Sequence, residues 1–133
     1  MAIRGAKPPA GDGRSFERVS SDGRVVAGLR LAERLTVDGR TLRDVPLAHV
    51  SVDGLPLLAP SPLAAAVAGE PPLEAGFAVQ RVTRPRAAGG VASLSVTLRE
   101  RDGLQRLITW NIQCGGDRVS FRFTLPREVP VAG

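Results

Sequence analysis

The sequence has little of several residue types on which common protein functions depend. It contains one cysteine, one histidine and no tyrosine, and aromatic side chains make up 4% of the chain. The single Cys114 has no partner for a disulfide within the chain, which is typical of a reducing compartment. One histidine and one cysteine give no metal-ligand spacing, so we expect neither a metal nor another cofactor. The aromatic rings are too few for a platform on which nucleic-acid bases stack, and we expect no specific nucleic acid as partner.

Long apolar runs are also missing. No run approaches the roughly 18–20 apolar residues that a membrane-spanning helix needs. The stretch from Met1 to Arg14 lacks the continuous apolar core of a secretory signal. We therefore expect a cytoplasmic domain without membrane insertion, either a whole protein or one module of a longer chain.

Enzyme signatures are absent from the sequence. There is no nucleophile elbow, no Walker loop and no dinucleotide-binding glycine pattern. On a straight strand His49, Ser51 and Asp53 would share one face, but they would stand in a row rather than in the arrangement of a proton relay. We expect no catalytic residues and no enzymatic activity.

Basic residues are in excess. The chain has 18 lysines and arginines against 13 acidic residues, and every basic residue except Lys7 is arginine. A guanidinium presents a planar fork of donors that fits phosphate groups and guanine edges. Because the arginines are spread along the chain, this charge permits a phosphate-bearing ligand without requiring a nucleic acid.

Apolar and polar residues alternate along most of the chain, which is typical of β-strands with one buried face. Asp-Gly pairs separate several of these stretches and favour tight hairpin turns. The expected strands cover residues 25–37, 40–52, 55–59, 77–83, 91–99, 104–113 and 118–125. A short helical segment is predicted over residues 63–69, because a proline precedes this stretch, an alanine run fills it and Gly69 ends it.

These elements predict an all-β fold, a small antiparallel barrel or sandwich of six to seven strands with one short helical segment. The chain is long enough for a single core. We expect a flexible, arginine-containing N-terminal arm over residues 1–22, one β-barrel domain over residues 23–128, and a C-terminal tail over residues 129–133.

Two short motifs bear on function. Arg14 and Arg18 form an Arg-x-x-x-Arg pair in the arm, and residues 49–54 read His-Val-Ser-Val-Asp-Gly. The second motif has the form (Asp/Asn)-x-Ser-x-x-Gly with histidine in the first place. The order and separation of the two motifs resemble those of a PilZ domain, and the resemblance covers residues 14–58. PilZ domains are six-stranded β-barrels that bind the bacterial second messenger cyclic di-GMP, so the resemblance favours the barrel.

The resemblance also implies a ligand site. Arg14 and Arg18 would clamp phosphates and guanine edges, Ser51 would donate to a phosphate, and Gly54 would let the backbone approach the ligand. His49 departs from the family's Asp or Asn and accepts fewer hydrogen bonds, as expected of a degenerate member. The implied function is a bacterial signalling domain that responds to cyclic di-GMP and controls a protein partner, such as one in exopolysaccharide synthesis or motility.

The residues leave a second function open. Arg-x-x-x-Arg pairs recur elsewhere in the chain, so this motif is not specific by itself. An exposed edge strand could recruit a partner by strand addition. An apolar contact patch could form from Leu55, Leu57, Leu58 and Leu63, beside the proline-rich run over residues 56–72. The alternative is a non-catalytic structural or protein-interaction β-domain within a larger assembly, without a nucleotide ligand.

Overall fold

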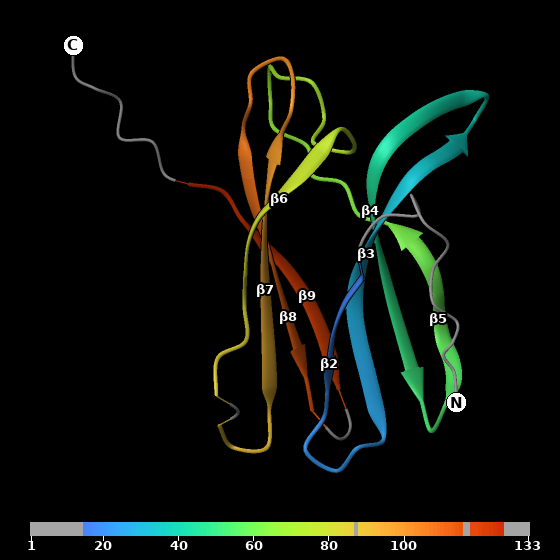
Figure 1. Cartoon of the computed structure of the whole chain (residues 1–133), viewed down its shortest axis with the longest axis vertical. Helices are drawn as coiled ribbons and strands as arrows, with labels where there is room; N and C mark the ends of the chain where they lie inside the picture. The colour runs from blue at the N-terminus through green and yellow to red at the C-terminus, as the bar shows by residue number, and fades with distance from the viewer. Residues whose placement is uncertain (1–14, 87, 116–117, 127–133) are drawn as a thin grey trace.

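Two antiparallel β-sheets pack face to face in the computed structural model (Figure 1). The structure describes residues 15–86, 88–115 and 118–126. The first sheet has the strand order β2-β3-β4-β5 and the second has the order β6-β7-β8-β9, so each strand pairs with its neighbour in sequence. The strands are β2 (Ser15–Val19), β3 (Val25–Val37), β4 (Arg40–Val52), β5 (Leu55–Pro62), β6 (Phe77–Thr83), β7 (Ala92–Glu100), β8 (Leu107–Cys114) and β9 (Val119–Thr124).

The predicted all-β, antiparallel architecture is confirmed. The described residues form eight strands in two open sheets, which is a sandwich rather than a closed barrel. Strands β3, β4 and β6 have the predicted bounds, and the other predicted strands differ by one to three residues at one or both ends. Within the described ranges there is no helix long and apolar enough to cross a membrane.

The predicted helical segment over residues 63–69 is wrong. Ala65 there forms an antiparallel bridge with Leu73. The Ala65 N–H donates to the Leu73 carbonyl at 3.1 Å, and the Leu73 N–H donates back at 2.8 Å. Both side chains are buried against the core. Non-local backbone hydrogen bonds and burial therefore override the helical propensity of the alanine run.

The predicted N-terminal arm also needs correction where it meets the domain. Residues Ser15–Val19 are not a flexible arm but strand β2, paired along β3 and at the end of its sheet among the described strands. The Phe16 side chain packs against the core, which holds this short strand in place. Residues 1–14, with Arg14, lie outside the described residues, as do residues 127–133.

Tight turns join β3 to β4 and β4 to β5 as predicted. Both residues of Asp38-Gly39 and of Asp53-Gly54 have φ between 49° and 81°. Positive φ at both central positions is the requirement of a type I′ hairpin turn. At Asp102-Gly103 only the glycine has positive φ, and the chain continues through Gln105 at φ 53° before β8 begins. That connection is a longer loop.

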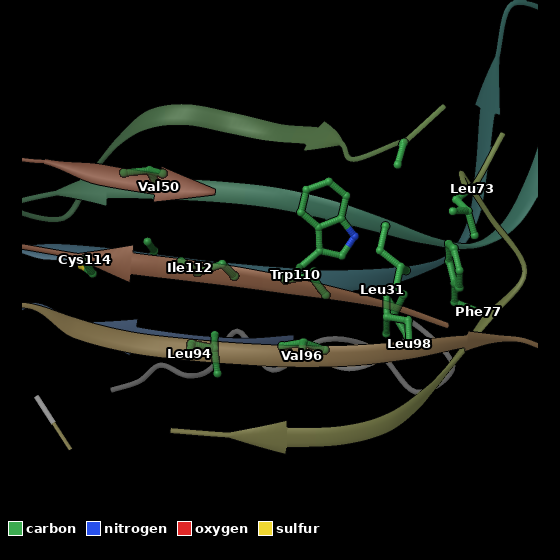
Figure 2. Packing of buried hydrophobic residues seen from close by; sticks show 14 of the residues in the cluster. Leu31, Val50, Leu73, Phe77, Leu94, Val96, Leu98, Trp110, Ile112 and Cys114 are labelled. Atoms are coloured by element: carbon green, nitrogen blue, oxygen red, sulfur yellow. The ribbon is translucent and has the colours of Figure 1, made fainter. Parts of the chain in front are cut away.

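The core lies between the two sheets and is built from alternate residues of their strands. Trp110, Ile112 and Cys114 form one row along β8 (Figure 2). Leu94 and Val96 on β7 are fully buried beside that row. Burying a side chain such as Leu94 contributes about 1.5–3 kcal/mol, so these alternating positions account for much of the stability.

Candidate functional site

The structure places the predicted ligand residues on opposite faces of the first sheet. Arg18 lies in register with Ala27, which is in register with Val50. Ala27 and Val50 are buried in the core, so Arg18 projects from the same, inner face at the edge of the sheet. His49 is one residue away from Val50 along β4 and therefore projects from the outer face. The structure brings His49 and Ser51 onto one face and separates them from Arg18.

Arg18 is held at the rim of the sandwich. One terminal nitrogen of its guanidinium donates to the carbonyl oxygen of Pro85 at 2.8 Å. This contact joins the edge strand β2 to the loop that follows β6. For Arg18 to reach a ligand above His49, this contact would have to break and the side chain would have to pass around the sheet edge.

His49 faces a carboxylate across the outer face. Its Nε2 lies 3.6 Å from Oε2 of Glu17, and Gly28 of β3 lies between the two residues in the cross-strand register. Burial lowers the pKa of His49 below its usual value, the Glu17 carboxylate partly opposes this, and Arg30 adds to the lowering. This lowering favours the neutral form of the imidazole. The arrangement provides one half-buried histidine beside one exposed carboxylate.

Ser51 and Gly54 lie at the end of β4 nearest the turn. Ser51 is in register with Val26 on one side and Pro56 on the other. A β-carbon placed on Gly54 would meet nothing within 4 Å, but its φ of 81° strains any other residue. The glycine therefore serves the turn, and the structure shows no close backbone approach that requires it.

Asp53 is bound to Arg24 and not to His49. The Arg24 guanidinium donates to both carboxylate oxygens, with distances of 3.1 Å and 3.0 Å. This pairing lowers the pKa of Asp53. The Asp53 N–H also donates to the Arg24 carbonyl at 2.7 Å. The arrangement of His49, Ser51 and Asp53 is therefore not that of a catalytic triad.

Cys114 and the acidic residues of the described part provide no metal site. No group of three or more His, Cys, Asp or Glu side chains lies close enough there to hold an ion. The Cys114 thiol is buried and donates to the Val25 carbonyl at 3.3 Å. Burial raises the pKa of this thiol, which disfavours the reactive thiolate.

An ion-pair cluster surrounds Arg106 at one end of the second sheet. Arg106 donates to both carboxylate oxygens of Glu100, each at 2.8 Å, and to Glu70 at 2.9 Å. The Arg106 and Glu100 side chains are only 15% and 13% exposed. A cavity of about 520 Å³ lies beside Arg106 and Glu70. The Arg106 guanidinium already binds two carboxylates. The cluster therefore has a structural role: it links Glu70, in the segment before Leu73, to the β7–β8 connection.

An open, mostly apolar groove lies between β5 and β9, which each end a sheet within the described residues. Its volume is about 600 Å³. Leu57 at its wall is 72% exposed, and the neighbouring Leu55 is 71% exposed. The groove is lined by Val25, Val50, Val52, Leu57, Leu58, Arg118, Val119 and Phe121. We refer to this feature below as the β5–β9 groove.

Sequence reasoning found one wall of the groove and missed the other. The apolar cluster on β5 is visible in the sequence, but the alternation of β9 predicts that Val119 and Phe121 simply face the core. They do face inward, yet they remain partly exposed because β9 is the last strand of its sheet among the described residues. The signal available in the sequence was the position of this strand as the last in a meander, which makes it an edge.

Comparisons with known proteins support the fold and leave the function open. No protein-family description and no curated protein matches the sequence. Structures of a glycoside hydrolase family 97 enzyme from Pseudoalteromonas sp. strain K8, including complexes with panose and with acarbose, are similar to this chain at a TM-score of 0.65 and 13% sequence identity. The similarity covers 87% of this chain and 18% of that chain. At this identity the likeness shows the fold alone, a β-sandwich.

Proposed function

We propose that this chain is a non-catalytic interaction domain that holds a segment of another protein, or of another domain, in the β5–β9 groove. The observation that carries the proposal is the exposure of Leu55 and Leu57 beside that groove. Fully burying a leucine is favourable by about 1.5–3 kcal/mol, so exposed leucines next to an apolar groove gain free energy when a partner covers them. Grouped apolar exposure of this kind marks contact sites.

The composition of the groove fits a protein partner better than a small polar ligand. All but one of its lining side chains are aliphatic or aromatic, and Arg118 is the single charged member. A nucleotide site would need several donors for phosphates and bases. A mostly apolar lining with one basic residue instead fits the apolar side chains of a polypeptide.

The likeness to the family 97 structures is consistent with a domain of this kind. There, a similar sandwich accounts for 18% of a longer chain. When a sandwich forms part of a longer chain, another domain of that chain can cover apolar side chains that the sandwich exposes. The partner in the β5–β9 groove can accordingly be another domain or a separate protein.

Position-specific cross-linking tests the proposal. A photoreactive amino acid replaces Leu57 in the groove or, as a control, the exposed Gln113 on the outer face of β8. In cells that produce the protein, we expect a discrete protein adduct from position 57 and none from position 113. No adduct from position 57, or equal adducts from both positions, would contradict the proposal.

Cyclic di-GMP binding is a separate proposal and rests on the motif resemblance. The spacing of the two motifs supports it, and the position of Arg18 on the inner face of the sheet does not add support. It can be tested independently of the groove, because Arg18, His49 and Ser51 do not line the groove.

A further inference from the structure

The β9 wall of the groove is a strand edge with available backbone groups. Within the described residues, β9 is the last strand of its sheet and pairs with β8. The Gly115 N–H donates to the Arg118 carbonyl at 2.8 Å, so the backbone groups of Arg118 point toward β8. Along a strand, the backbone groups of successive residues point alternately toward and away from the neighbouring strand. The backbone N–H and C=O groups of Val119, Phe121 and Phe123 therefore point away from β8. These groups are what an added antiparallel or parallel strand requires.

The opposite wall of the groove is closed to strand addition. In the part of the chain that the structure describes, β5 also ends its sheet, but it contains Pro56, Pro60 and Pro62. The Leu63 N–H donates to the Pro46 carbonyl on β4, so the nitrogen of Pro62 points away from β4. Proline has no N–H, so it removes a donor from this edge. A strand entering the groove can therefore pair with β9 and make only side-chain contacts with β5.

The two faces of β9 specify which side chains such a strand would carry. On the inner face of β9, Phe121 and Phe123 lie in register with Ile112 and Trp110, and Phe123 is 44% exposed. The Trp110 and Phe123 ring centres lie 5.5 Å apart. An added strand lies about 4.8 Å from β9, so its inward side chains would touch these rings and must be apolar.

The outer face of the second sheet favours acidic side chains on the added strand. Arg122 is exposed on the outer side of β9 and lies in register with Asn111. The four strands of this sheet contain one acidic residue, Glu100, which is bound by Arg106. Opposite charges on neighbouring strands stabilise a sheet, whereas like charges destabilise it. Carboxylates beside Arg122 would meet no competing acid.

We propose that β9 accepts an extended peptide strand of the partner in which apolar residues alternate with acidic residues. The apolar residues enter the β5–β9 groove, and the acidic residues lie beside Arg122 on the outer face. This inference rests on the proposed interaction function and adds to it the mode of binding and the chemistry of the partner.

Binding of a defined peptide to the full chain tests the inference. The probe is a fluorescent, end-capped heptapeptide of alternating valine and glutamate, followed by fluorescence anisotropy. We expect saturable binding, at least tenfold weaker binding when lysine replaces glutamate, and loss of binding when the amides that face β9 are N-methylated. Equal binding of the glutamate and lysine peptides, or binding unaffected by N-methylation, would overturn the inference.

Variants of the protein locate the binding. Arg122→Glu is expected to weaken binding of the glutamate peptide about tenfold and to strengthen binding of the lysine peptide. Arg81→Glu, the matched control on β6, is expected to change either affinity by less than twofold. Val119→Pro removes one outward N–H at the first position of β9 and is expected to abolish binding. Equal effects of Arg122→Glu and Arg81→Glu would overturn the inference even if Val119→Pro failed to fold.

The outcomes separate this inference from the proposed function. A cross-linked adduct at position 57 together with no binding of the alternating peptide would mean that the partner docks through side chains alone. The interaction function would then stand and the strand-addition inference would fall. If neither the adduct nor the peptide binding were observed, both the interaction function and the strand-addition inference would fall.

Discussion

A β-carbon on residue 28 would overlap the carbonyl oxygen of Phe16, so Gly28 is what allows β2 to pair closely along β3. Gly28→Ala is therefore expected to destabilise the fold by about 1–3 kcal/mol, since either strand must shift. Denaturant unfolding measures this change. Ser51→Ala on the same outer face is the control and should change the free energy of unfolding by less than about 0.5 kcal/mol. Wild-type stability of Gly28→Ala would contradict this role of the glycine.

The Glu100–Arg106 pair predicts a pH dependence of stability in the acid range. Hydrogen bonds from Arg106 hold the pKa of Glu100 below its ordinary value of 4.5. The carboxylate therefore contributes stability above that pH, and the contribution is lost as the pH falls through the lowered pKa. Glu100→Gln should cost about 2–3 kcal/mol at pH 7 and flatten the acid slope. Asp102→Asn, in the loop that follows Glu100, should keep the wild-type slope. Parallel stability curves for Glu100→Gln and wild type would contradict the prediction.

His49 predicts a second pH dependence, nearer neutrality. Burial lowers its pKa below 6.5, so the unfolded chain binds the proton more readily than the folded chain. Stability is therefore complete above pH 6.5 and decreases as the pH falls below it. Because the chain has one histidine, a single imidazole resonance in an NMR titration reports this pKa. Glu17→Gln should lower the pKa further, and a rise in that variant would contradict the geometry of the pair.

The PilZ resemblance predicts that cyclic di-GMP binds and that Arg14 and Arg18 are needed. Isothermal calorimetry with cyclic di-GMP, with GTP as the control ligand, tests both statements. The resemblance predicts selective binding at micromolar affinity or tighter, lost in the double variant Arg14→Ala/Arg18→Ala. If Arg18→Ala binds cyclic di-GMP with the same heat as the wild type, Arg18 does not bind the ligand. That result would agree with the contact between Arg18 and Pro85.

Much of the strand pattern could be predicted because it depends on neighbouring residues. The alternation over residues 25–37 and 40–52, with the Asp38-Gly39 pair between them, fixes two strands and the turn that joins them. Ser15–Val19 was missed because a strand of five residues with one core side chain, Phe16, carries too little periodicity. Its pairing depends on Gly28, which is distant in sequence.

The candidate site could be predicted only in part, because its geometry depends on contacts between distant residues. The face on which Arg18 lies follows from its register with Ala27, which no local pattern reveals. The bridge between Ala65 and Leu73 likewise depends on segments that local propensity treats separately. The β5–β9 groove needs both sheets to be assembled before it exists, so only the exposed leucines of β5 could be anticipated.

The most direct test of the interaction function asks whether the two walls of the groove hold the same partner. A benzoylphenylalanine at position 123, two residues beyond the groove-lining Phe121 on the same face of β9, cross-links beside the β9 wall and preserves an aromatic ring near Trp110. Leu57→Asp then changes the opposite wall, at a side chain that is 72% exposed and contributes little to folding. We predict an adduct from position 123 that disappears in the Leu57→Asp background, while the unfolding midpoint stays unchanged. An adduct whose yield is independent of Leu57→Asp would contradict a shared groove and, with it, the proposed function.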